Sequence, residues 1–177
     1  AWVFARGAYG RGYPTLGGFD QMTARVGGFW DSMLGEGRRW WITANSDSHI
    51  HYTEGGIDFW PGEYSKTYVH AIKEHADILD GIRQGRVFVT TGDLVSELYV
   101  TVSQESAQAA MGGELLLEDG QLIEVLVRLK DPDNKNSAGR NPSVARVDLI
   151  VGELTGPGKN LDWDEHKSVQ VVKRFTR

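Results

Sequence analysis

Residues 121–130 read QLIEVLVRLK, and this stretch decides the fold class of the second half of the chain. Apolar and charged side chains alternate along it, with Ile123, Val125, Val127 and Leu129 on one side and Glu124, Arg128 and Lys130 on the other. An alternation with a period of two predicts a strand that buries one face. The Asp119-Gly120 pair just before it favours the tight turns that join antiparallel strands.

Strand-like sequence continues on both sides of this stretch. Further strands are predicted at residues 86–91, 94–102, 114–117, 143–151 and 168–175. No helical pattern interrupts them after residue 93. Residues 94–177 are therefore predicted to form an all-β domain, an antiparallel β-sandwich, and residues 1–93 an α/β part.

The α/β part combines two helical patterns with one extended segment. Residues 21–36 predict a helix interrupted at Gly27-Gly28, and residues 38–44 predict a short buried strand. Residues 65–84 predict a second helix that ends at Gly85. Its apolar face consists of Ile72, Ala76, Leu79 and Ile82.

The composition argues against several kinds of partner. The chain has 177 residues, a formal net charge of -5 and no cysteine. An acidic chain without a basic stripe lacks the Lys and Arg residues that neutralise phosphates, so no nucleic acid is expected. No apolar run approaches the ~20 residues that cross a bilayer, so no membrane partner is expected. Both ends of the chain are strand-like, and we expect it to be a fragment of a longer protein.

The candidate chemistry lies in residues 40–51, which read WWITANSDSHIH. A hydrophobic strand leads into Asp47 and His49, and His51 continues the alternation. Residues two apart on an extended chain point to the same side, with Cα atoms roughly 6.5 Å apart. A carboxylate and an imidazole so placed can bind one metal ion, and without cysteine any transition metal must use His, Asp, Glu or water. An Asp after a strand is also often a turn or cap residue, so the triplet alone leaves metal binding open.

Residues 45–49, NSDSH, resemble the last motif of the polymerase and histidinol phosphatase (PHP) superfamily, in which the Asp and the His both bind metal. Residues 85–93, GRVFVTTGD, resemble the segment that leads into a C-terminal β-sandwich in the carbaryl-hydrolase-like branch. Residues 111–115 and 146–150 continue the resemblance, which extends from about residue 25 onward. It implies the C-terminal part of a PHP-type distorted α/β barrel, followed by an antiparallel β-sandwich.

The function that this resemblance implies is metal-dependent hydrolysis. A metal-activated hydroxide would attack a small-molecule phosphate ester, or an ester or carbamate, at a centre of two or three zinc, manganese or iron ions. Asp47 and His49 are the catalytic metal ligands that the resemblance carries to this chain. The family's early His-x-His motif and its middle His and Glu ligands have no counterpart here, so the chain alone is expected to be catalytically incomplete. Relatives with such sandwiches are often exported, which favours an exported or periplasmic location over a cytoplasmic one.

Other residues and other functions are also considered. His51, Glu63 and Tyr64 are candidates for substrate binding, although Phe59 and Trp60 beside them are expected to be packing residues. The remaining histidines are expected at the surface or in packing roles, with His70 and His75 on a helix and His166 solvated. The main alternative function is a non-catalytic β-sandwich module that binds a carbohydrate or a protein. A purely structural role, including formation of a homo-oligomer, is a third hypothesis.

Overall fold

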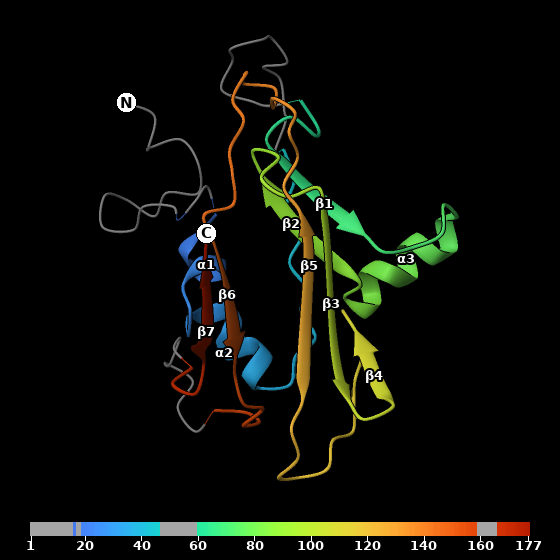
Figure 1. The fold of residues 1–177 in the computed structure, drawn as a ribbon, viewed down its shortest axis with the longest axis vertical. Coiled ribbons are helices and arrows are strands. Elements are labelled where there is room, and N and C mark those ends of the chain that lie inside the picture. Colours follow the sequence, from blue (N-terminus) through green and yellow to red (C-terminus); the bar gives the residue numbers. More distant parts are fainter. Residues whose placement is uncertain (1–15, 17–18, 47–59, 159–165) are drawn as a thin grey trace. The chain divides into compact units, whose positions relative to one another are not determined.

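A computed structural model describes residues 16, 19–46, 60–158 and 166–177 (Figure 1). Within this part the elements are α1 (Gln21–Ala24), α2 (Phe29–Gly35), β1 (Ser65–Val69), α3 (His75–Gln84), β2 (Val87–Thr91), β3 (Glu97–Gln104), β4 (Ala107–Ala110), β5 (Glu124–Lys130), β6 (Arg146–Val151) and β7 (Gln170–Thr176). All strand pairs are antiparallel, in the orders β1-β2, β4-β3-β5 and β6-β7. The described residues contain no closed barrel. The chain is thus mixed and rich in antiparallel sheet, as its sequence predicts at the coarse level.

The chain divides into two compact units, residues 1–40 with 145–177 and residues 41–144. All three helices of the described part precede residue 93, and β3 to β7 follow it. The predicted domain boundary at residue 93 falls inside the second unit and stays a prediction. None of the helices in the described part is long and apolar enough to span a bilayer.

The first unit contains α1, α2 and the β6–β7 pair. The predicted helix is interrupted as expected: α1 ends at Ala24, and Gly27, with a φ of +73°, and Gly28 lie in the break before α2. The side chain of Asp20 accepts a hydrogen bond from the Met22 amide, which satisfies a backbone donor that a helix leaves free at its N-terminus. The side chain of Asp31 accepts a hydrogen bond from the Gly27 amide in the break.

The second unit contains the antiparallel β1–β2 pair, and α3 lies in the connection between these two strands. The predicted helix over residues 65–84 is wrong for its first part, since Ser65–Val69 is a strand and only His75–Gln84 is helical. Tyr68 lies opposite Phe88 in the ladder and stacks on it with ring centroids 4.7 Å apart. Such cross-strand aromatic pairs stabilise a sheet, and the tertiary pairing here overrides the local helical pattern. The end of α3 agrees with its prediction, because Gly85 adopts a left-handed conformation with a φ of +75°.

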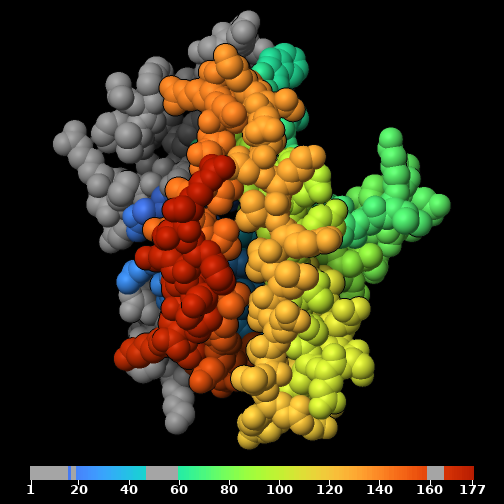
Figure 2. Space-filling model, viewed as in Figure 1, coloured from blue at the N-terminus to red at the C-terminus, as the bar shows by residue number. Residues whose placement is uncertain are grey.

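The β4-β3-β5 sheet contains the strand predicted most clearly. Along β5 exposed and half-buried residues alternate, which confirms the period of two. In the space-filling view of Figure 2, β5 lies at the surface, as this alternation requires. The predicted strand at 114–117 is wrong, and β4 takes its place beside β3. Residues 113–118 run irregularly, and the side-chain amide of Gln104 binds both the N–H and the C=O of Glu118 at the end of this stretch.

Candidate functional site

The predicted metal ligands Asp47 and His49, and His51 after them, lie outside the described residues. The described chain reaches Ser46 and continues from Trp60. The site is therefore built from the residues that precede Asp47 and those that follow residue 59. All of these belong to the second unit.

The strand predicted for residues 38–44 is wrong, because none of these residues is in a strand. The segment of residues 41–46, which leads into Asp47, is irregular. It forms no ladder with a neighbouring strand. Its first residue, Trp41, donates a hydrogen bond from its indole Nε1 to the carbonyl of Arg83 near the end of α3, at 3.0 Å. The Trp41 ring also lies against Gly85, where a Cβ atom would come within 2.4 Å of Cε2. Glycine is thus required at position 85 both by its positive φ and by the ring beside it.

Two hydroxyl side chains of β1 hold the other end of this segment. The amide of Ala44 donates to Oγ1 of Thr67 at 2.8 Å, and the same hydroxyl lies 3.1 Å from the carbonyl oxygen of Ala44 and donates to it. The hydroxyl of Ser65 donates to the carbonyl of Asn45 at 2.5 Å. Side chains two apart on a strand share a face, so Ser65 and Thr67 bind consecutive residues of the segment. We call these three hydrogen bonds the hydroxyl clamp.

The hydroxyl clamp is partly shielded from water. Ser65 has a relative exposure of only 7%, whereas Thr67 and Ala44 are half-buried and Asn45 is exposed. A hydrogen bond to a buried group is costly to lose, because the group is then left without a partner. The clamp therefore attaches Ala44 and Asn45 to β1.

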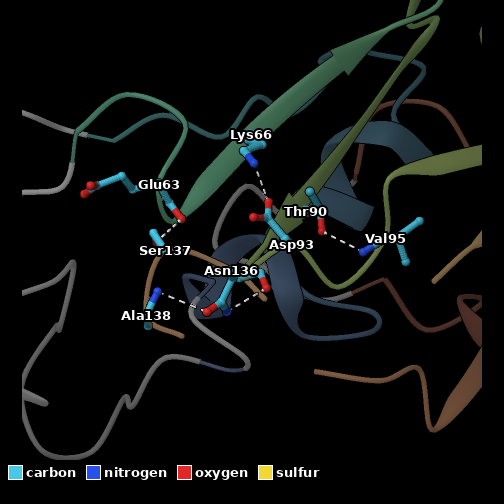
Figure 3. Close-up of polar contacts among 9 residues, drawn as sticks. Glu63, Lys66, Thr90, Asp93, Val95, Asn136, Ser137 and Ala138 are labelled. Atoms are coloured by element: carbon cyan, nitrogen blue, oxygen red, sulfur yellow. Dashed lines mark hydrogen bonds and ion pairs between the residues drawn. The ribbon is translucent and has the colours of Figure 1, made fainter. Parts of the chain in front are cut away.

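The residues that follow the undescribed stretch form a turn. The amide of Glu63 donates to the carbonyl of Trp60 at 3.0 Å, and the carboxylate of Glu63 accepts from the Trp60 amide at 2.9 Å. The Glu63 carbonyl accepts from the Ser137 hydroxyl, and its side chain points away from Lys66 and Asp93 (Figure 3). Glu63 therefore uses its carboxylate to close this turn. Trp60 is half exposed, at 50%, which contradicts its predicted packing role.

Tyr64 lies next to the end of β2. Its carbonyl accepts a hydrogen bond from the Gly92 amide at 2.7 Å. Gly92 and Asp93 both have positive φ, +61° and +58°, so the chain turns sharply after β2. Asn136 donates to the Gly92 carbonyl at 3.0 Å and ties the loop after β5 to this turn.

An ion pair joins β1 to this turn. Nζ of Lys66 lies 2.5 Å from Oδ1 of Asp93, and the two side chains are 31% and 26% exposed (Figure 3). Lys66 lies between Ser65 and Thr67 in β1, so its side chain leaves the strand on the other face. The Asp93 carboxylate is thus already paired with a cation.

The other histidines have structural contacts. Nε2 of His70 lies 2.9 Å from the carbonyl oxygen of Leu98, and its ring lies between Phe88 and Tyr99, so a packing role is confirmed. His70 precedes α3, however, and only His75 is on the helix. The solvated position expected for His166 is wrong. Its ring lies against Gly35, with Nδ1 2.9 Å from the Ser168 hydroxyl.

The described residues contain no group of three metal-binding His, Cys, Asp or Glu side chains. In the second unit a hollow of about 140 Å³ lies beside His70 and Tyr99, and neither Glu63 nor Tyr64 lines it. The described part of the site is therefore a support for the segment before Asp47 rather than a formed cavity. Comparisons with protein-family models, with curated proteins and with solved structures give no match to this chain.

Proposed function

We propose that this chain is the C-terminal part of a metal-dependent hydrolase of the PHP type, with Asp47 and His49 as metal ligands. In the complete enzyme, the part before residue 93 would belong to a distorted α/β barrel, and the strands after it to an antiparallel β-sandwich. The substrate would be a small phosphate ester, an ester or a carbamate. An exported location and a homo-oligomer stay predictions.

The observation that supports this proposal is the fixed backbone before Asp47. The indole of Trp41 binds the end of α3, and the hydroxyl clamp binds Ala44 and Asn45 to β1. Support of this kind suits metal ligands, because a site binds tightly when its ligands are held close to their final positions.

The donor set fits the metals proposed. A carboxylate and an imidazole are ligands that zinc, manganese and iron all accept, and the chain has no cysteine to favour softer metals. Zinc typically takes about four ligands, so two residues leave the site incomplete. We therefore propose that the remaining ligands belong to residues outside this chain.

A divalent ion at such a site would polarise the substrate and lower the pKa of a water molecule. The contribution of this chain is to hold two of the ligands and one side of the substrate. His51 and Tyr64 stay candidates for substrate contact. Glu63 would act indirectly, because its carboxylate already closes the turn at Trp60.

The test uses the full-length protein with its metals supplied. Wild type, Asp47→Ala and His49→Ala are compared for metal content by mass spectrometry and for hydrolysis of an activated phosphodiester and an activated ester. His75→Ala is the matched control, because this histidine is exposed on α3. We expect both site variants to lose metal and turnover while the control keeps both.

Unchanged metal content and turnover in His49→Ala would rule out this function. A metal-free full-length protein that binds glycans would instead support the binding module. The present chain on its own is expected to show no appreciable hydrolysis, because it holds only two of the ligands.

A further inference from the structure

We infer that the outer edge of β5, the side that faces away from β3, pairs with the same edge of a second copy of this chain. β5 is the last strand of the β4-β3-β5 sheet, and none of the strands that the structure describes pairs with its outer side. A free strand edge presents backbone N–H and C=O groups that another strand can bind. The inference concerns assembly and does not depend on the proposed metal site.

The outer edge of β5 is long and regular. All seven residues of the strand, Glu124–Lys130, pair with β3 without a shift of register. The strand contains neither proline nor glycine. Edges that are protected from association are typically short, bulged or interrupted by proline. β5 has none of these three features, so its backbone is suited to accept a further strand.

The two cations of β5 lie towards β3. The guanidinium Cζ of Arg128 lies 5.3 Å from the centroid of the Tyr99 ring. Nζ of Lys130 lies 3.2 Å from Oε1 of Glu97. Tyr99 and Glu97 are the residues opposite these cations in the β3–β5 ladder. Charged side chains can protect a free edge by covering it, but these two interact with the neighbouring strand instead.

The sequence of β5 is complementary to itself in the antiparallel direction. In a register centred on Val127, Glu124 of one copy lies opposite Lys130 of the other, and symmetry repeats this pair. Val125 then lies opposite Leu129. Opposite residues in an antiparallel pair share a face of the sheet, so exposed side chains meet exposed ones and half-buried side chains meet half-buried ones. This match of charge and burial favours a second copy as the occupant of the edge.

Other registers fit less well. A centre at Leu126 leaves only residues 124–128 within the pair, and a centre at Arg128 places two like charges opposite each other. A slip of one residue would turn the half-buried face of one copy to the exposed face of the other. The register centred on Val127 pairs the whole of β5 and joins the β4-β3-β5 sheets of both copies into one.

The predicted interface is small. A single pair of strands buries less surface than a standard protein interface, which totals about 1,600 Å², so we expect a dimer that dissociates on dilution. The backbone ladder supplies the attraction, and the charge pairs select the register. Lys130 would lie between Glu97 of its own chain and Glu124 of the second copy.

The first test measures the mass of the full chain by light scattering over a range of concentrations. We expect the mass to rise from that of one chain towards that of two. Glu124→Lys and Lys130→Glu should each weaken the dimer by about tenfold or more, because like charges then face each other, and the two changes together should restore it. Glu105→Lys makes an equal change of charge in the exposed turn between β3 and β4 and should have no effect.

The second test uses the absence of cysteine, because a single introduced cysteine can form a disulfide only with another copy. Val127→Cys should be cross-linked by mild oxidation, since opposite residues of an antiparallel pair have Cα atoms about 4.5–5.5 Å apart, which a disulfide spans. Val100→Cys is the matched control. Val100 is half-buried and lies opposite Val127 on β3, so in the dimer it is several strand spacings away from its counterpart.

A chain that keeps the mass of one copy at every concentration would overturn the inference. Cross-linking of Val127→Cys no faster than that of Val100→Cys would also overturn it, as would a dimer that Glu124→Lys leaves unchanged. Far-UV circular dichroism checks that each variant is folded. If Val127→Cys does not fold, the charge-swapped pair decides, because restoration of the dimer cannot result from unfolding. The metal content and turnover that test the proposed function are measured separately, so the two can fail independently.

Discussion

Replacement of Gly85 by alanine tests the contact that begins the support of residues 41–46. A Cβ atom at this position would lie 2.4 Å from Cε2, 2.6 Å from Cδ2 and 2.9 Å from Cζ2 of Trp41. Carbon atoms in contact are normally about 3.5–4.0 Å apart. The indole ring therefore has to move by roughly 1 Å or more, and its hydrogen bond to the Arg83 carbonyl is put at risk.

The expected cost has two parts. A non-glycine residue in the left-handed conformation costs roughly 1–2 kcal/mol, which applies to Gly85 because its φ is +75°. Overpacking against the ring typically adds about 1–3 kcal/mol, lowered by any movement that the half-exposed indole allows. We therefore expect Gly85→Ala to lower the free energy of unfolding by about 2–4 kcal/mol.

Gly120→Ala is the matched control for the conformational part. Gly120 has a φ of +78°, and a Cβ atom there would meet nothing within 4 Å. Both variants are measured by urea unfolding followed by far-UV circular dichroism, together with exchange of the Ala44 amide. Gly85→Ala should cost more than Gly120→Ala and should speed Ala44 exchange, whereas Gly120→Ala should leave this exchange unchanged.

The same substitution in a Trp41→Ala background separates the two causes. Without the indole ring, the cost of Gly85→Ala should fall to that of Gly120→Ala. If Gly85→Ala costs no more than Gly120→Ala in the wild-type background, or costs as much with Trp41 removed, then the reasoning from this contact is refuted.

Three further predictions concern polar contacts away from the hydroxyl clamp. Hydrogen bonds from the Ile72 amide, and to a smaller extent from Arg86, lower the pKa of the Asp77 carboxyl below 3.8. The ionised carboxylate therefore stabilises the fold at pH values above its unfolded-state pKa, and this stabilisation is lost as the pH falls through the lower folded-state pKa. Asp77→Asn should remove this part of the acid dependence of urea unfolding. Two hydrogen bonds from Arg174, at 2.8 and 2.9 Å, lower the pKa of Asp148. In a ¹³C NMR titration, Arg174→Met should raise the pKa of Asp148 towards 3.8. An unchanged pKa would contradict the conclusion that Arg174 lowers it. Asn136→Ala removes the side chain that accepts hydrogen bonds from the Ala138 and Arg140 amides and donates one to the Gly92 carbonyl. The free energy of unfolding in urea should fall by about 1–3 kcal/mol. Asn134→Ala is the control and should change it little.

The sequence predicts those elements well in which one physical signal dominates. The alternation of β5 and the left-handed Gly85 after α3 both agree with the structure. Each depends on a property of the segment itself, namely one buried face or the freedom of glycine at positive φ. The β6 and β7 strands also overlap the stretches predicted as strands.

Errors occur where contacts between distant segments decide the conformation. Residues 65–69 continue a helical pattern in sequence but pair with β2, because the Tyr68–Phe88 stack and the ladder together outweigh a weak local preference. The hairpin between β3 and β4 was missed, because its turn contains Glu105 at a φ of +52° instead of a glycine. A rare backbone conformation of this kind leaves no reliable signal in a single sequence.

The candidate site shows the same limit. Asp47 and His49 can be proposed from a short motif, since a carboxylate and an imidazole two residues apart carry recognisable chemistry. Ser65 and Thr67 cannot, since a serine and a threonine in a predicted helix have no distinctive pattern. Their role depends on where residues 44 and 45 lie in space.

The failure of the predicted strand at residues 38–44 is informative about the site itself. A ladder beside β1 would bind alternate residues all along the segment and would impose the register of β1 on the chain beyond it. The hydroxyl clamp binds only Ala44 and Asn45, so the chain is fixed at one place and can then diverge from the strand. Such an attachment has fewer hydrogen bonds than a ladder and stabilises the fold less, but it fixes the positions of Ala44 and Asn45 relative to β1. Residues 44 and 45 are thus held by side-chain hydroxyls of β1 and not by strand pairing, which a sequence pattern does not reveal.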